Sequence, residues 1–141
     1  MVIDGVILPD LPLDIFVENY QELFASYGLS FIFLITPETA EARIREIDKA
    51  STAFIYAVSS SSTTGSKSSI DDAQEYLRRL DKMQLKHPIL TGFNIKDRDS
   101  YEAACQHTRG GIIGSAFIRS LSQSGDLKNT ISTFIKSIRT S

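Results

Sequence analysis

The sequence is short of several residue types that particular functions need. In 141 residues it has one cysteine and two histidines, and 15 Lys and Arg stand against 17 Asp and Glu. Because a single thiol cannot form a disulfide within the chain, the fold must be stable with Cys105 reduced, and we expect a cytoplasmic protein with this side chain buried. The slightly negative charge argues against a phosphate-backbone binder, so no nucleic-acid partner is expected.

Long hydrophobic runs are also missing. The longest uncharged apolar stretch, residues 23–37, contains Ser, Gly and Pro, and it is shorter than the ~20 residues that a membrane-spanning helix needs. The start of the sequence has no basic region and is interrupted by Asp4 and Asp10, unlike a secretory signal. We therefore expect no membrane segment, and we predict a strand that begins at the start of the sequence.

Five short apolar runs alternate with segments of helical periodicity. The runs predict strands at residues 2–8, 31–35, 53–58, 88–91 and 111–113, with helices between them that include residues 13–27, 70–86 and 97–108. Because each run is continuously apolar, we expect an α/β fold whose parallel sheet is covered on both faces. Two architectures fit: part of a (β/α)₈ TIM barrel, or an open doubly wound sheet with the first strand between the second and third.

In both architectures a ligand binds at the carboxyl ends of the strands. Gly114 there permits close approach of a ligand to the backbone, and Ser115 is expected to cap the short helix that follows, whose first amides favour an anion. This pattern favours phosphate. The alternatives are that Gly114-Ser115 merely turns a strand into a capped helix, and that the serine-rich stretch 59–69 is a flexible linker.

Acid and base groups are scarce at this edge. Asp10 is the acid nearest to the carboxyl end of a strand, and between Pro9 and Pro12 it is interpreted as a turn residue. His87 and His107 are expected to be structural or exposed. No His/Cys cluster has the spacing of metal ligands, so we expect no metal, no cofactor and no catalytic residue in this chain.

Four segments together carry a resemblance to a known family. They are residues 4–12 (DGVILPDLP), 56–65 (YAVSSSSTTG), 90–95 (LTGFNI) and 113–116 (IGSA). In order and spacing they resemble the alpha subunit of tryptophan synthase, a TIM barrel. The resemblance implies a lyase of tryptophan biosynthesis that cleaves indole-3-glycerol phosphate to indole and glyceraldehyde 3-phosphate. It also implies that residues 1–141 form one domain, equivalent to barrel strands 4 to 8 without the first three strands.

The resemblance also implies roles for individual residues. The family's substrate-adjacent tyrosine falls on Tyr56, and its loop threonine, which closes over a catalytic acid, falls on Thr64. Family members often have Gly where Asn94 stands. The phosphate pocket would consist of Gly65, Phe93, Asn94, Gly114 and Ser115.

The family's catalytic glutamate and aspartate sit on and after the second barrel strand, outside the part that this sequence resembles. We therefore expect the chain to look truncated and to be inactive alone, although it retains phosphate contacts. The intact enzyme's partner would be the beta subunit. Open sheet edges, with Ile3, Ile7, Ile112 or Ile113 partly uncovered, predict self-association. The alternative function is a self-contained five-stranded open α/β module that binds a phosphorylated small molecule, and strand order distinguishes the two.

Overall fold

The structure is a computed structural model, and it describes residues 3–58, 70–92, 95–122 and 125–139. Short strands alternate with helices along the described chain. The strands are β1 (Gly5–Val6), β2 (Ser30–Phe31), β3 (Leu34–Ile35), β4 (Ile55–Ala57), β5 (Ile89–Thr91) and β6 (Gly110–Gly111). The helices are α1 (Leu13–Asn19), α2 (Gln21–Ser26), α3 (Glu41–Ala50), α4 (Ile70–Lys82), α5 (Arg98–Cys105), α6 (Ser115–Leu121) and α7 (Leu127–Ile138).

All strands pair in parallel and in chain order. β1 pairs with β2, and β3, β4, β5 and β6 follow one another in a four-stranded sheet. β2 and β3 belong to one extended segment, because the Ile32 amide donates to the Val6 carbonyl while the Phe33 carbonyl accepts from the Tyr56 amide, both at 2.9 Å. The result is an arc with the first strand at its edge, so the doubly wound alternative is wrong for the described residues.

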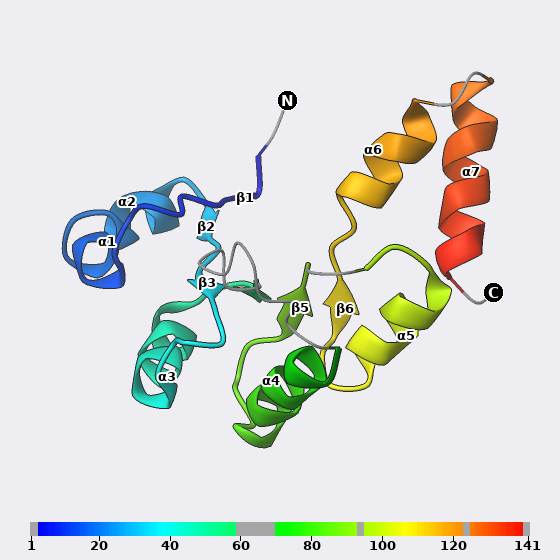
Figure 1. Cartoon of the computed structure of the whole chain (residues 1–141). Helices are drawn as coiled ribbons and strands as arrows, with labels where there is room; N and C mark the ends of the chain where they lie inside the picture. Colours follow the sequence, from blue (N-terminus) through cyan, green and yellow to red (C-terminus); the bar gives the residue numbers. More distant parts are fainter. Residues whose placement is uncertain (1–2, 59–69, 93–94, 123–124, 140–141) are drawn as a thin grey trace.

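The helices follow the outside of this arc in chain order, from α1 and α2 at one end to α6 and α7 at the other (Figure 1). Several differ from their predicted bounds. The predicted helix 13–27 is divided at Tyr20, whose backbone leaves helical geometry (φ −126°, ψ −19°). α4 ends at Lys82, and Gln84 just beyond it adopts the left-handed conformation (φ 48°). α5 ends at Cys105, and just beyond it the Thr108 hydroxyl donates a hydrogen bond of 2.8 Å to the Ala104 carbonyl.

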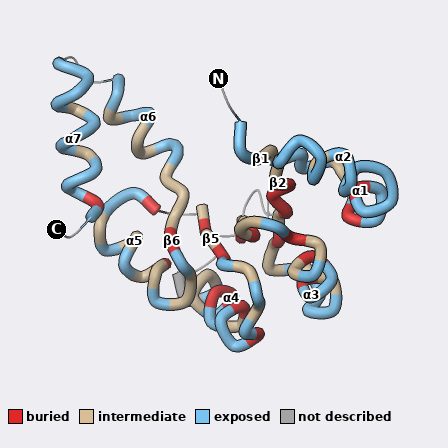
Figure 2. The backbone as a smooth tube through the Cα atoms, turned by 180° about the vertical axis from the view of Figure 1, so that it is seen from behind, coloured by how far each residue is buried: buried red, intermediate tan, exposed pale blue. Residues whose placement is uncertain are grey.

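Buried and half-buried residues alternate along β4 and β5 of the four-stranded sheet, and Figure 2 colours the backbone by burial. Ile55 and Ala57 of β4 are fully buried on the outer, helix-covered face, whereas Tyr56 between them is half-buried on the concave face. Ile89, Leu90 and Thr91 repeat this pattern in β5. The prediction that both faces are covered is therefore wrong for the described chain, because a five-stranded arc has no opposite strands to fill its concave side.

The main core lies between the early helices and the sheet. An aromatic cluster of Phe16, Phe24, Phe31 and Phe33 joins α1 and α2 to the segment 30–35, and the Phe16 and Phe31 rings stack with centroids 4.3 Å apart. The connected core of buried residues extends from Leu13 to Ile89. Later residues add Ile95, Ala104 and Ile138, which are buried outside it.

Large apolar side chains are exposed at the two ends of the arc and not between them, as far as the chain is described. At one end they lie on and near β1, α1 and α2, and at the other on α6 and α7. They are Ile3, Ile7, Leu8, Ile15, Val17, Tyr20, Leu23 and Tyr27, then Ile118, Leu121, Leu127, Ile131 and Ile135. Two separated ends therefore carry unpartnered apolar surface.

Candidate functional site

The candidate site lies at the carboxyl ends of the strands. Among the residues assigned to it from sequence, the described ones are Tyr56, Gly114 and Ser115. The remaining site residues, Thr64, Gly65, Phe93 and Asn94, fall outside the described residues. Tyr56 lies on β4, whereas Gly114 and Ser115 lie where the chain passes from β6 into α6.

Tyr56 packs directly on Gly92, the residue that follows the next strand, β5. A Cβ atom at Gly92 would overlap the Tyr56 hydroxyl and would come within 2.5 Å of the ring carbons Cε2 and Cζ. The Gly92 amide donates to the Ala57 carbonyl at 3.3 Å, which keeps the two segments side by side. Glycine at position 92 therefore makes room for the tyrosine on the concave face.

Gly114 and Ser115 form an open helix start. Gly114 precedes α6 with φ −97°, and a Cβ atom added to it would meet nothing of the chain within 4 Å. No side chain caps the helix, and Ser115 is its first residue, so the predicted capping role of Ser115 is wrong. The first helical hydrogen bond runs from the Ile118 amide to the Gly114 carbonyl, so the preceding amides have no acceptor inside the helix.

A second glycine contact lies beneath this segment. A Cβ atom on Gly111 would overlap Ile95 Cδ1 and would come within 3.1 Å of Tyr101 Cδ2. Ile95 is buried, and α5 begins shortly after it. The close packing holds Ile95 and the start of α5 against the end of β6.

The start of α5 is held by a capping box, which the sequence analysis did not identify. The Ser100 amide donates to Asp97 Oδ1 at 3.0 Å, and the Asp97 amide donates to the Ser100 hydroxyl at 3.1 Å. The Ser100 hydroxyl and amide also hold the pKa of Asp97 below its ordinary value. The spacing Asp-x-x-Ser resembles the usual capping-box signature, whose third helical residue is Glu or Gln.

The loop after β3 is anchored by α4. Arg79 Nη2 donates to the Pro37 carbonyl at 2.9 Å, and its guanidinium lies 5.5 Å from the centre of the Tyr76 ring. Burial raises the pKa of Tyr76. The Thr36 amide donates to the Thr39 hydroxyl at 2.9 Å, which closes the turn. The Arg79 contact with Pro37 joins residues far apart in sequence, and no local signal indicated it.

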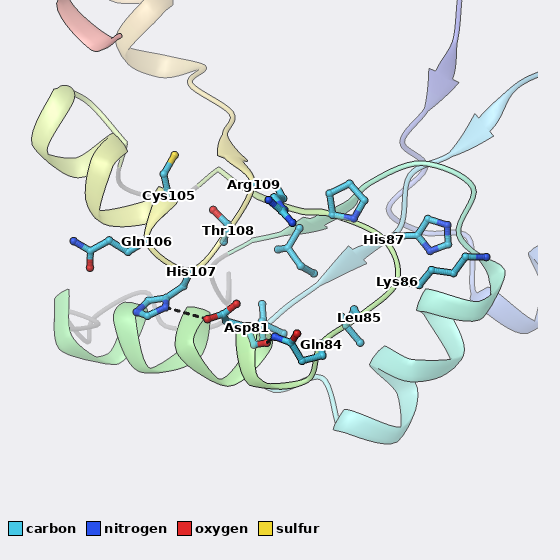
Figure 3. Close-up of a pocket in the computed structure, with 13 residues that line it drawn as sticks. Asp81, Gln84, Leu85, Lys86, His87, Cys105, Gln106, His107, Thr108 and Arg109 are labelled. Carbon is cyan, nitrogen blue, oxygen red and sulfur yellow. Dashed lines mark hydrogen bonds and ion pairs between the residues drawn. The ribbon is translucent and has the colours of Figure 1, made fainter. Parts of the chain in front are cut away.

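Both histidines lie at the opposite, amino-terminal edge of the sheet. They line a hollow of about 510 Å³ at the ends of α4 and α5 (Figure 3). His107 Nδ1 lies 3.6 Å from the Asp81 carboxylate, and His87 Nδ1 lies 3.1 Å from Asp48 Oδ1. Cys105 lines the same hollow and is partly exposed, so its predicted burial is wrong. This edge is therefore separate from the candidate site.

Asp48 connects α3 to the segment before β5. Its carboxylate accepts hydrogen bonds of 2.9 Å from the amides of both Lys86 and His87. Burial alone would raise the pKa of Asp48, but these amides and the His87 ring together outweigh it and hold the pKa below its ordinary value. The aspartate therefore has a structural role at the amino-terminal edge.

The described residues contain neither a metal-binding cluster nor a membrane-spanning helix. Among them, no group of three or more His, Cys, Asp or Glu side chains is placed to hold a metal ion. No described helix combines the length and the hydrophobicity needed to cross a membrane.

Comparison with known proteins connects this geometry to one family. The family model described as tryptophan synthase alpha chain matches residues 1–140. The alpha chain of Flavobacterium psychrophilum is 49% identical over 137 residues, and that of Christiangramia forsetii is 47% identical over 138 residues. The alignments cover 96% and 97% of this chain and 53% of each relative. The chain thus spans about half the length of the curated relatives it matches.

Solved structures agree on the fold. A chain of the tryptophan synthase complex from Pyrococcus furiosus superposes with a TM-score of 0.76 at 23% identity, with 96% of this chain and 53% of that chain covered. The alpha chain from Legionella pneumophila gives a TM-score of 0.77 at 22% identity, with 96% and 50% covered. The parallel arc is therefore part of the TIM-barrel fold of these proteins, and by its match over nearly the whole sequence the chain belongs to the tryptophan synthase alpha chain family.

Proposed function

We propose that this chain provides the phosphate-binding part of a lyase that cleaves indole-3-glycerol phosphate to indole and glyceraldehyde 3-phosphate. The observation that carries the proposal is the open start of α6. Gly114 has free space where a side chain would be, and the first amides of the helix lack helical acceptors. Such amides, with the positive end of the helix dipole, favour a phosphate group.

The segment in front of α6 has the position of a common phosphate site in TIM barrels. In that fold phosphate is frequently bound by the loops after strands 7 and 8 and by the start of a short extra helix. β5 and β6 would be these two strands if the arc corresponds to barrel strands 4 to 8. In that case Phe93 and Asn94 would complete the phosphate pocket with Gly65, Gly114 and Ser115, while Thr64 and Tyr56 would lie next to the rest of the substrate.

Cleavage requires general acid and base groups. In the proposed function, these groups do not come from this arc. The family resemblance assigns that chemistry to a glutamate and an aspartate on and after the second barrel strand. We therefore infer that residues 1–141 form one domain of five βα units, that it binds the substrate phosphate, and that turnover needs the first three units as well. The beta subunit would be the partner of the complete enzyme. Cytoplasmic localisation stays a prediction.

The test separates binding from cleavage. The 141-residue chain would be titrated with glycerol 3-phosphate by calorimetry and assayed with indole-3-glycerol phosphate, alone and after mixing with the part of the Flavobacterium psychrophilum alpha chain that it does not match. We expect saturable phosphate binding, no cleavage by the chain alone, and cleavage by the mixture. Cleavage by the chain alone would contradict the assignment of the acids, and absence of phosphate binding would contradict the site at α6.

The exposed ends of the arc favour association between copies of this chain. Apolar side chains near β1 and on α1 and α2 at one end, and on α6 and α7 at the other, have no cover in the described chain. Open sheet edges and apolar patches promote pairing with other chains. We therefore also propose that the 141-residue chain self-associates.

A further inference from the structure

A second hollow lies on the outer side of the sheet, between α4 and α5. It has a volume of about 450 Å³. Ala73 and Leu77 of α4 form one wall, and Ala103 and Ala104 of α5 form the facing wall. The amide of Gln74 spans the two helices with a long hydrogen bond of 3.4 Å to the Ala103 carbonyl. Three alanines at the facing positions leave the space open.

One residue that lines this hollow has a polar atom without a hydrogen-bond partner. Thr91 lines the hollow and is fully buried, with 0% of its surface exposed, and its hydroxyl has no hydrogen-bond partner in the structure. Leaving such a group unsatisfied costs about 1–3 kcal/mol. A ligand that reaches Thr91 would therefore gain a hydrogen bond that the free protein lacks.

Charge at the rim restricts the class of ligand. Asp97 and Asp99 carry two negative charges there and Lys96 carries one positive charge, so an anion would meet net repulsion. Hydrophobic walls with a small number of placed polar groups are typical of sites for small organic molecules. The rim and the walls together favour a neutral ligand with an apolar body.

We propose that the hollow between α4 and α5 binds a small neutral molecule with an apolar body and one hydroxyl or N–H group, which hydrogen-bonds to Thr91. The site differs from the proposed phosphate site, because Thr91 faces the outer helices with Ala57, whereas Tyr56 and Leu90 face the concave side. The proposal therefore does not depend on the enzyme activity.

The test uses phenol as the probe and toluene as a control of the same shape without the hydroxyl. Both are titrated into the isotopically labelled 141-residue chain, and amide shifts of Leu77, Ala103 and Ala104 are followed by NMR. Phenol is expected to bind at one site, about two- to tenfold more tightly than toluene, which is the usual net gain from one hydrogen bond. The same titrations are repeated with Thr91→Val, which keeps the shape, and with Ala73→Leu, which fills the hollow.

The variants give distinct outcomes. Thr91→Val should weaken phenol binding about two- to tenfold and leave toluene binding unchanged. It should also raise the melting temperature, because it removes the unsatisfied hydroxyl. Ala73→Leu should abolish binding of both probes. Equal affinities for phenol and toluene in the original chain, unchanged phenol affinity in Thr91→Val, or no saturable shifts at the α4 and α5 amides would each overturn the proposal.

Discussion

The aromatic ring of Tyr56, on β4, lies against the α-carbon of Gly92, just after β5, on the concave face of the sheet. No side chain larger than hydrogen fits at position 92 while the tyrosine keeps its place. The need for glycine here is steric, since it comes from a neighbouring strand. The contact also places the Tyr56 hydroxyl beside the segment that leads to the proposed phosphate pocket.

Gly92→Ala should destabilise the chain by about 1–3 kcal/mol, the usual cost of forcing extra atoms into a packed position. In a chain that already carries Tyr56→Ala, adding Gly92→Ala should cost much less stability, because the clashing ring is gone. Urea denaturation of the four proteins measures the coupling, which should lie in the range of about 0.5–3 kcal/mol found for residues in contact. Additive effects would show that the two residues do not touch.

Gly114→Ala is the matched contrast, because an added Cβ there meets nothing of the chain. Its stability should stay within about 0.5 kcal/mol of the original, as for substitutions that create no clash. Its affinity for glycerol 3-phosphate should nevertheless fall at least about tenfold if the ligand approaches the backbone at this point. Calorimetric titration measures the affinity, and an unchanged value would remove Gly114 from the proposed pocket.

Asp48→Asn should make the chain less stable at neutral pH and less sensitive to acid. A carboxylate whose pKa is lowered on folding stabilises the native state above its ordinary pKa of 3.8, and this contribution disappears as the pH falls through the lowered value. The loss at pH 7 should be about 1.5–3 kcal/mol, as for hydrogen bonds to a charged group.

The measurement for Asp48 is the free energy of unfolding from pH 2 to 7. The difference between the two proteins should shrink toward zero at the acid end. Asp81→Asn serves as the control, because its carboxylate is half-exposed and lies farther, at 3.6 Å, from its histidine; its effect should stay below about 1 kcal/mol. A constant difference across the pH range would argue against the ionised carboxylate as the cause.

The double variant Ile131→Lys/Ile135→Lys should reduce self-association, because both residues are exposed on α7 at one end of the arc. Light scattering over a range of protein concentrations should show the original chain growing in mass and the variant remaining closer to 15.6 kDa. Ser132→Lys on the same helix adds charge without removing apolar surface and should have little effect. A monomeric original chain would refute self-association.

The alternation of strands and helices was predictable because each strand is a short apolar run bounded by Gly, Pro or polar residues. The bounds were less accurate, and β1 is a clear case. The apolar run at residues 2–8 predicted a long strand, whereas Gly5–Val6 alone pairs with β2. The sequence shows which residues favour extended structure, but the length of a strand depends on how many of them pair with the neighbouring segment.

The candidate site was predictable where the signal was local. Gly114 follows an apolar run and precedes a helix, and both facts are visible in the sequence. The capping role of Ser115 was wrong because the helix begins one residue earlier than a serine cap requires. The contact of Tyr56 with Gly92, the Arg79 anchor on Pro37 and the buried Thr91 hydroxyl arise between segments distant in sequence, so no local pattern indicates them.

The uneven distribution of the core has a consequence for dynamics. The connected buried cluster ends at Ile89, so α5, α6 and α7 rest on few buried side chains and on polar ties such as Arg98, which donates to the carbonyls of Lys136 and Arg139. Regions with few buried contacts open locally at lower free energy than the core. A phosphate held at α6 would therefore suppress local opening, and slower amide exchange in the last third of the chain would record its binding.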